Sequence, residues 1–178
     1  MRKLRNSELN RLTINEFKKA EKIPVVVILD NIRSLNNVGS VFRTSDAFRI
    51  EKIILCGFTA TPPHKEIHKT ALGAEDSVEW QFAENTEDAV IMLKNAGHTI
   101  CSIEQVENSV PLPDFQVSKD KKYALIFGNE VKGVQQKVVD LSDYSIEIPQ
   151  EGTKHSLNIS VSAGVVLWEF YRKLKKEG

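Results

Sequence analysis

The stretch PVVVILD (24–30) is a short, uninterrupted apolar run rich in β-branched residues. A strand with one wet face alternates apolar and polar positions, whereas a continuously apolar strand is covered on both faces. We therefore expect a strand inside a parallel sheet, with helices on both sides. The polar residues that follow, DNIRSLNNVGSVFRTSD (30–46), would leave this strand at its carboxyl end.

The same alternation continues along the chain. Further apolar runs predict strands over 52–58, 78–82, 98–104, 122–130 and 144–149. Helical patterns occupy 38–48, 86–95 and 134–141, and a final helix follows residue 158. Strands that alternate with helices indicate an α/β fold with a parallel sheet flanked by helices. We place a short basic helical extension at 1–22 and the main domain at 23–178.

Composition excludes several classes of protein. The chain has 178 residues, of which 41% are hydrophobic and 27% charged, so neither disorder nor a membrane protein is indicated. No apolar run approaches the ~20 residues of a spanning helix, and none follows the basic start as a signal peptide requires. We expect a cytoplasmic protein. Cys56 and Cys101 lack the paired spacing of a zinc site or disulfide framework, so we expect buried free thiols.

The formal net charge is zero, but the charges are unevenly distributed. Residues 1–22 and 171–178 are both net basic, and the middle of the chain is therefore net acidic. A basic segment at each end suits a polyanion held by local patches. For either segment alone, an ordinary solvated helix face explains the charge equally well.

The last helix, within SLNISVSAGVVLWEF (156–170), carries apolar residues on two stripes. The first stripe is Leu157, Val161, Val165 and Trp168, and the second is Ile159, Ala163, Val166 and Phe170. Such a helix is expected to be buried on two sides. One side would face the sheet and the other a partner subunit, with Gly164 allowing close approach. The alternative is a helix deep within its own core.

Several common sites are absent from the sequence. It contains no G-x-G-x-x-G and no G-x-x-x-x-G-K-[ST]. This excludes the ordinary phosphate-binding loops of dinucleotide-binding proteins and of nucleoside triphosphatases. His155 and Ser156 are neighbours, but no G-x-S-x-G elbow frames the serine, so hydrolase chemistry is disfavoured. His64 and His68 lie four apart without a third ligand, and we interpret them as surface histidines with no metal site.

Arg43 and Glu130 are the charged residues that a purely structural interpretation explains least well. We place Arg43 on a helix opened by Asn36 or Asn37, near the crevice at the strand ends where ligands bind in open α/β sheets. Its guanidinium could clamp a phosphate or carboxylate with two parallel hydrogen bonds. Glu130 follows another strand and could orient Arg43 or Asn37. A solvated arginine beside turn residues is the alternative on spacing alone.

Three segments at the strand ends resemble the signature motifs of the SpoU-type (TrmH-like) RNA methyltransferases of the SPOUT superfamily. The N-x-G-x-x-x-R pattern is NVGSVFR (37–43), and the G-x-E-x-x-G pattern is GNEVKG (128–133). The third motif is IPQEGTKHSLNIS (148–160). The similarity extends over about residues 24–171, and three motifs in register are far more specific than one.

The resemblance implies an α/β domain whose C-terminal part forms a deep trefoil knot, a rare exception among folds. It also implies S-adenosylmethionine bound within the knot and an active site completed across a homodimer. By motif position, the residues expected to hold the cofactor are Gly128, Ile148, Leu157 and, from a neighbouring segment, Ile103. The expected catalytic set is Asn37, Arg43, Glu130, Ser156 and Asn158.

The implied reaction transfers a methyl group to a ribose 2′-hydroxyl of tRNA or rRNA, with tRNA slightly favoured. Arg43 as a general base would need a large fall in its pKa, so we prefer an arginine that binds phosphate and stabilises the developing alkoxide. Two alternatives stay open: a methyltransferase of the same superfamily that acts on a base nitrogen, and a non-catalytic RNA-binding module.

Overall fold

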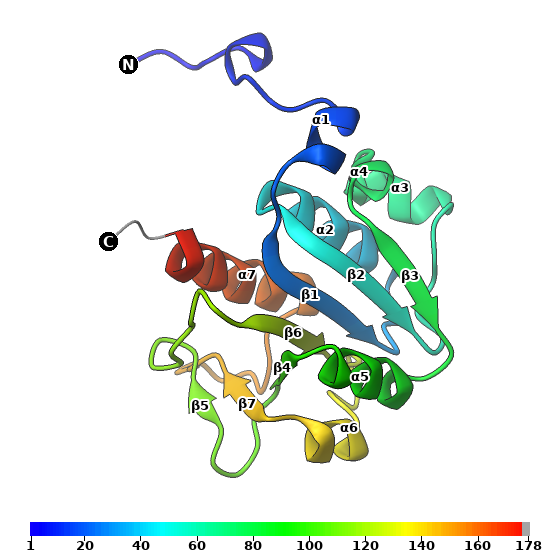
Figure 1. Cartoon of the computed structure of the whole chain (residues 1–178), viewed down its shortest axis with the longest axis vertical. Helices are drawn as coiled ribbons and strands as arrows, with labels where there is room; N and C mark the ends of the chain where they lie inside the picture. The colour runs from blue at the N-terminus through cyan, green and yellow to red at the C-terminus, as the bar shows by residue number, and fades with distance from the viewer. Residues whose placement is uncertain (176–178) are drawn as a thin grey trace.

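The structure, a computed structural model, describes residues 1–175 of the chain, in which one sheet of seven strands forms the centre (Figure 1). The strand order is β3-β2-β1-β6-β4-β7-β5, and every pairing between these strands is parallel. The bounds are β1 Ile23–Asp30, β2 Ile50–Cys56, β3 Trp80–Ala83, β4 His98–Ile103, β5 Val110–Pro111, β6 Lys122–Phe127 and β7 Tyr144–Glu147. The expected parallel sheet is confirmed.

Helices cover both faces of this sheet (Figure 1). α5 and α6 lie on one face, and α2, α3, α4 and α7 lie on the other. The bounds are α1 Ile14–Lys19, α2 Leu35–Ala47, α3 Lys65–Ala71, α4 Ala74–Ser77, α5 Thr86–Asn95, α6 Gln136–Leu141 and α7 Ile159–Lys175, with a 3₁₀ helix at Asn6–Glu8. Among the described residues, no helix is long and apolar enough to cross a membrane.

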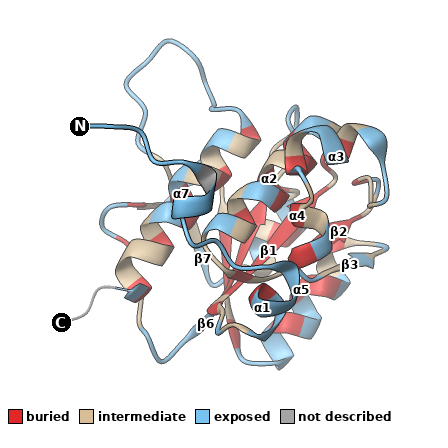
Figure 2. Ribbon diagram, turned by 90° about the horizontal axis from the view of Figure 1, so that it is seen from above, coloured by how far each residue is buried: buried red, intermediate tan, exposed pale blue. Residues whose placement is uncertain are grey.

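Strand β1 explains why the core has two parts. Its side chains alternate between the faces, so Val27 and Leu29 join the core under α2 and α7, whereas Val26 and Ile28 join the core under α5 and α6. All four are at most 1% exposed. Figure 2 shows the buried residues concentrated in the strands and on the inward faces of the helices. The uninterrupted apolar run therefore predicted the two-sided cover correctly.

The structure corrects the expected start of the helix that carries Arg43. α2 begins at Leu35, and its N-cap is Ser34, whose side chain accepts a hydrogen bond from the Asn37 backbone N–H at 3.3 Å. Neither Asn36 nor Asn37 opens the helix. A serine oxygen satisfies an otherwise unpaired N–H of the first turn, and this frees the Asn37 side chain for other contacts.

Two short helices between β2 and β3 were not expected from the sequence. His64 caps α3, since its Nδ1 accepts from the Glu66 N–H at 3.1 Å. Leu72 and Gly73 then adopt left-handed backbone conformations between α3 and α4. Helices this short carry too little periodicity for a confident sequence prediction.

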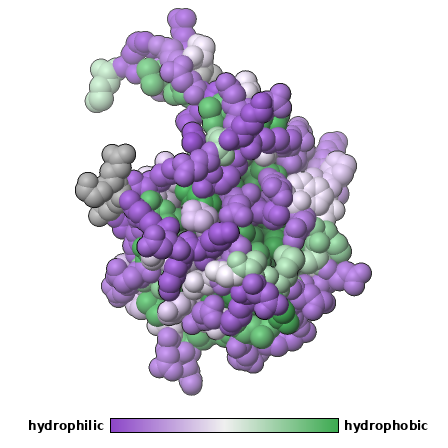
Figure 3. All heavy atoms as spheres, in the orientation of Figure 1, coloured by the Kyte–Doolittle hydropathy of each residue, from purple (hydrophilic) through white to green (hydrophobic). Residues whose placement is uncertain are grey.

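The N-terminal extension forms η1 and α1 and projects from one end of the body (Figure 1). Phe17 is its one buried side chain within the described part of the segment, and α1 contacts α4. Figure 3 shows that the rest of this projection is mostly hydrophilic, with a few hydrophobic residues. At the other end, Arg172 and Lys173 pair with Glu169, and 176–178 of the expected basic segment lie outside the described residues.

The two cysteines are free and fully buried, as expected. Burial raises the pKa of the Cys56 thiol to about 12 and also raises the pKa of Cys101. Both thiols are therefore protonated and unreactive at neutral pH.

Helix α7 is buried on one side only within its own chain, so the alternative of a helix deep within its own core is wrong. The side that we expect to face a partner subunit is exposed. Its second stripe, Ile159, Ala163, Val166 and Phe170, is at most 7% exposed. Its first stripe is open: Leu157 is 39%, Val161 50%, Val165 40% and Trp168 51% exposed. A Cβ added at Gly164 would meet nothing within 4 Å. The chain's own core does not cover this face.

Candidate active site

Glu130 joins the loop after β6 to the start of α2. Its carboxylate accepts hydrogen bonds from the backbone N–H groups of Arg33 and Ser34, each at 3.0 Å, and from Asn37 Nδ2 at 3.1 Å. Partial burial would raise the pKa of Glu130, but these hydrogen bonds to the charged form outweigh it and lower the pKa below its ordinary value. Glu130 is therefore an anion at neutral pH and fixes the Asn37 amide.

Asn158 extends this group to the third motif. Its Nδ2 donates to Asn37 Oδ1 at 3.2 Å. The same side chain begins α7, because its Oδ1 accepts from the Ser160 N–H at 2.9 Å and from Ser160 Oγ at 2.7 Å. Glu130, Asn37 and Asn158 thus form one hydrogen-bonded chain drawn from all three motifs.

A second layer of polar residues, which the sequence analysis did not select, holds these loops in place. Asp30 is fully buried at the end of β1 and accepts from Thr86 Oγ1 at 2.6 Å and Gln135 Nε2 at 2.8 Å. Asn31 lies beside it with a left-handed backbone, and its carbonyl accepts from Asn129 Nδ2 at 2.6 Å. Asp30, Asn31 and Asn129 lie within the polar segments that follow the strands, and this position is the sequence feature that could have identified them.

Arg43 lies apart from this group. It is exposed on α2, and among the described residues its guanidinium has no hydrogen bond or ion pair. The suggestion that Glu130 orients Arg43 is therefore wrong, whereas the suggestion that Glu130 orients Asn37 is confirmed. A free guanidinium remains available to an external anion.

Ser156 lies in an exposed loop, and its side chain makes no hydrogen bond to a described residue. Nothing joins it to the His155 ring, so the pair has no hydrolase geometry. One side chain ties this loop to the sheet: Gln105 Nε2, just after β4, donates to the His155 carbonyl at 3.1 Å. Gln105 was not selected from the sequence, because no motif marks it.

A cavity of about 610 Å³ opens beside this polar group. Its wall includes all four residues expected to hold a cofactor, namely Ile103, Gly128, Ile148 and Leu157. Glu130, Ser156 and Asn158 line it as well, whereas Asn37 and Arg43 do not. The volume lies within the roughly 300–1,000 Å³ typical of small-molecule sites.

The wall of the cavity depends on a close approach between two backbone segments. A Cβ added at Gly128 would lie 2.1 Å from the Gly133 carbonyl carbon and from the Val134 nitrogen. Gly133 has φ +67°, which a residue with a side chain rarely adopts. Glu104 Oε2 accepts from the Val134 N–H at 2.9 Å and closes the turn. Both motif glycines are thus required by space or conformation.

His64 and His68 do not form a metal site with each other. Both are exposed, His64 caps α3, and His68 Nδ1 lies 2.6 Å from Glu75 Oε1. Within residues 1–175, no three His, Cys, Asp or Glu side chains are grouped so that they could hold a metal ion.

Comparison with known proteins agrees with the three motifs. The model of the SpoU rRNA Methylase family matches residues 24–168. The chain belongs to this family. A relative from Borreliella burgdorferi, described as an uncharacterized tRNA/rRNA methyltransferase, is 33% identical over 90% of this chain and 69% of its own length.

Solved structures of SpoU-type proteins share the fold. The AdoMet-bound rRNA methyltransferase of Sinorhizobium meliloti is 27% identical, with a TM-score of 0.79 over 90% of this SpoU family member and 61% of that chain. The TrmH/SpoU tRNA modifying enzyme of A. aeolicus is 24% identical, with a TM-score of 0.79 over 90% and 81% of the two chains. This SpoU chain spans about two thirds of the length of the curated relatives it matches.

Proposed function

We propose that this SpoU family member is an S-adenosylmethionine-dependent RNA methyltransferase that modifies a ribose 2′-hydroxyl of tRNA or rRNA. The observation that carries the proposal is the hydrogen-bonded chain of Glu130, Asn37 and Asn158 at the mouth of the cavity that Gly128, Ile148 and Leu157 line. All three motifs contribute to one place. The motif pattern resembles the ribose-modifying branch, so the ribose is favoured over a base nitrogen.

The cavity fits S-adenosylmethionine by size and by chemistry. Ile103, Ile148 and Leu157 offer apolar contacts for the adenine, and the backbone at Gly128 approaches without a side chain in the way. The relative from S. meliloti is described as bound to this cofactor. When bound, the cofactor supplies an electrophilic methyl group on a sulfonium.

The polar chain is suited to orienting the acceptor nucleotide. Glu130 holds the Asn37 amide, and the Asn37 oxygen accepts one of the two amide hydrogens of Asn158. The second Asn158 amide hydrogen remains available beside the cavity for a ribose or phosphate oxygen. Ser156, exposed on the same wall, offers a further hydroxyl to the RNA. These groups bind and orient, and none of them needs to change protonation state.

Arg43 is assigned to the RNA phosphate and to the alkoxide that develops during transfer. It is free and exposed, and it does not line the cavity of its own chain. We propose that a homodimer brings it to the partner's cavity. The exposed stripe of α7 supports this assembly, since a contiguous apolar face is typical of an interface.

We also propose the deep trefoil knot for the C-terminal part of the domain. β7 lies beyond β4 in the sheet, yet the next helix, α7, packs back against α2. The segment between them must therefore cross the carboxyl end of the sheet, where Gln105 holds it. This path supports a knotted arrangement around the cofactor cavity.

We propose that the extension at 1–22 is an RNA-binding appendage and that the main domain, from residue 23 onward, is the catalytic domain. The basic extension favours RNA as the partner, tRNA slightly before rRNA, and the cytoplasm remains the expected location. Arg2 is paired with Glu8, and Lys22 donates to the Phe17 and Ala20 carbonyls, so the remaining basic side chains of the extension would carry the contact.

Two experiments test the function. Calorimetric titration with S-adenosylmethionine and S-adenosylhomocysteine, alongside the mass in solution, should give binding to a dimer. Incubation with tRNA and rRNA followed by nuclease digestion should give a 2′-O-methylnucleoside. A methylated base would favour the base-nitrogen alternative, and a folded dimer that binds no cofactor and yields no product would favour the RNA-binding module.

A further inference from the structure

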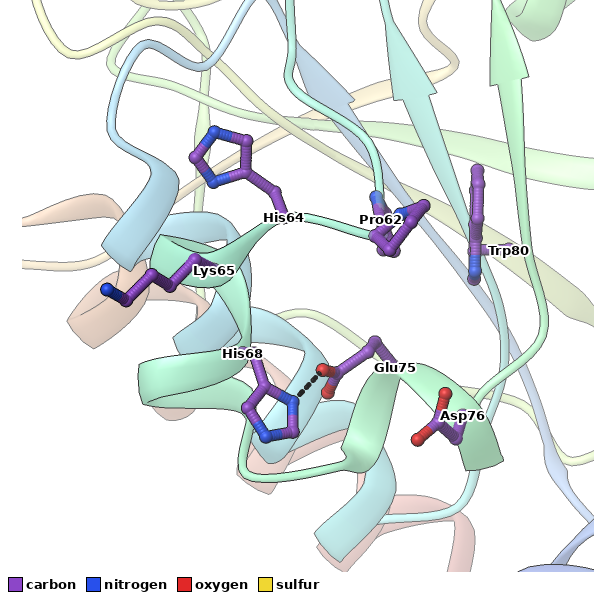
Figure 4. Close-up of a pocket in the computed structure, with 8 residues that line it drawn as sticks. Pro62, His64, Lys65, His68, Glu75, Asp76 and Trp80 are labelled. Atoms are coloured by element: carbon purple, nitrogen blue, oxygen red, sulfur yellow. Dashed lines mark hydrogen bonds and ion pairs between the residues drawn. The ribbon is translucent and has the colours of Figure 1, made fainter.

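A second cavity, of about 540 Å³, lies beside the edge strand β3 and shares no lining residue with the cofactor cavity. The loop after β2, helices α3 and α4, and β3 enclose it (Figure 4). None of the three motifs contributes to its wall, so the proposed methyl transfer does not account for it.

The upper part of this cavity is an apolar slot. Trp80 and Pro62 stand opposite each other across it (Figure 4). Both are half-buried, and within the described chain no other aromatic ring packs against the Trp80 indole. An indole face and a proline ring are both surfaces against which a planar ring can stack, and unpaired RNA bases characteristically stack on exposed aromatic side chains.

The floor of the cavity is acidic. Glu75 is 9% exposed; its Oε1 contacts His68, and its Oε2 is buried without a hydrogen-bond partner. Asp76, the next residue, is exposed, and its carboxylate has no partner among the described residues. A buried acceptor left unpaired is costly, so a ligand with N–H donors would be stabilised here. The amino groups of adenine, guanine and cytosine supply such donors.

The rim of the cavity is basic. Lys65 is exposed and, in the described part of the chain, its ammonium group is unpaired. The His64 ring uses Nδ1 to cap α3 and keeps Nε2 free. The Lys65 ammonium group and His64 Nε2 could both donate to a phosphate at the rim of the cavity while the base of the same nucleotide lies in the slot. An aromatic wall, an acidic floor and a basic rim together match a nucleotide better than a purely cationic or purely anionic ligand.

The cavity is connected to the helix that carries Asn37 and Arg43. Thr70 Oγ1 of α3 donates to the Asn36 carbonyl at 3.0 Å. A Cβ at Gly39 would lie 2.1 Å from Thr70 Oγ1, so α2 and α3 are in tight contact. Arg43 follows Gly39 by one helical turn and lies on the same side of α2. RNA that contacts Arg43 can therefore extend toward this cavity.

We propose that the cavity between Trp80 and α4 binds an unpaired nucleotide of the RNA substrate, distinct from the nucleotide that is methylated, whose base carries an exocyclic amino group. The proposal rests on the proposed function, because it adds a contact to the same RNA. Methyl transfer itself is not needed to test it.

The chain has two tryptophans, so the variant Trp168→Phe leaves Trp80 as the only indole reporter. This protein would be titrated with AMP, GMP, CMP and UMP while indole emission is followed. We expect saturable quenching, with AMP, GMP and CMP binding at least threefold tighter than UMP. In the same background, Glu75→Gln and Asp76→Asn should each reduce that preference. The matched control is a separate single variant, Trp80→Phe, which keeps Trp168 as its only indole. The emission of that indole should not respond to the nucleotides.

Absence of quenching by all four nucleotides would overturn the proposal, as would equal binding of all four that Asp76→Asn leaves unchanged. Quenching by arginine amide and not by nucleotides would assign the slot to a basic peptide and also overturn it. Calorimetry with S-adenosylmethionine on the same preparation separates the two proposals, since loss of cofactor binding contradicts the proposed function while leaving the nucleotide titration readable.

Discussion

Asn158 Nδ2 lies 3.2 Å from Asn37 Oδ1, although 121 positions of the chain separate the two residues. Asn37 uses its amide group on Glu130 and its oxygen on Asn158, so it connects the second motif to the third. A side chain that satisfies two partners of opposite hydrogen-bonding character cannot be replaced by an acid or a base without losing one of them.

The substitution Asn37→Asp tests this connection. A carboxylate at this position would face the Glu130 carboxylate and lose the donated hydrogen bond, so we expect a loss of roughly 1–3 kcal/mol in unfolding free energy and of nearly all methyl transfer. Asn36→Asp is the matched control, since Asn36 is exposed on the same turn. Urea unfolding and a methylation assay measure both. Equal behaviour of the two variants would contradict the assignment.

The ionisation of Glu130 predicts a pH dependence. Its folded-state pKa is lowered from 4.5, so its contribution to stability is fully present above about pH 4.5 and is lost as the pH falls through the folded pKa below that value. The difference in unfolding free energy between the natural protein and Glu130→Gln should therefore be constant near neutral pH and shrink below about pH 4.5. Glu151→Gln removes a carboxylate from the exposed third-motif loop and is the matched control for the substitution itself.

Gly128→Ala should disrupt the wall of the cofactor cavity. The added methyl group would clash with the backbone at Gly133 and Val134, which cannot move as a flexible side chain could. We expect a stability loss of about 1–3 kcal/mol and a large loss of S-adenosylmethionine affinity by calorimetry. Gly152→Ala is the control, because a Cβ there meets nothing within 4 Å. A Gly128→Ala protein with unchanged affinity would refute the close-approach argument.

Val161→Glu tests the proposed homodimer. Val161 is 50% exposed in the first stripe of α7, and a carboxylate there would be buried unpaired in an apolar interface. We expect the mass in solution to fall from dimer to monomer. Ile91→Glu, on α5 at 45% exposure and on the opposite face of the sheet, should leave the mass unchanged. A monomeric natural protein, or a dimeric Val161→Glu protein, would exclude this face.

Gln105→Ala should weaken cofactor binding without unfolding the protein. It removes the side-chain contact that holds the third-motif loop at His155. One hydrogen bond is worth about 0.5–1.5 kcal/mol, which corresponds to a roughly 2- to 12-fold rise in Kd for S-adenosylmethionine. Gln116→Ala removes a similar exposed contact, to the Asp114 carbonyl, away from the cavity and should leave Kd unchanged.

The central strands and helix α5 could be predicted from the sequence because their patterns depend on burial alone. The predicted helix over 86–95 matches α5, and the run 24–30 matches β1 to within one residue. Helices α3 and α4 could not be predicted, since each is only one or two turns long and too short for an apolar stripe; His64 caps α3, and α4 has no side-chain cap.

The site was predictable only in part, for a physical reason. Motif positions identified Asn37, Glu130 and Asn158, and the structure brings these three together. Arg43 belongs to the same motif as Asn37 but lies further along α2 and makes no contact with the group. The spacing of residues along a helix does not show which loop each helix face contacts. Likewise, no sequence pattern indicates that Gln105 hydrogen-bonds to His155, which lies 50 positions later.

The double use of Asn158, as the first cap of α7 and as the partner of Asn37, also orders events during protein synthesis. Chains emerge from the ribosome N-terminus first, so Asn37 and Glu130 are exposed well before Asn158. Until Asn158 has emerged and α7 has formed, the polar chain ends at Asn37 and one wall of the cavity is missing. A nascent chain that stops short of this residue therefore carries the first two motifs but lacks the side chain that joins them to the cavity wall.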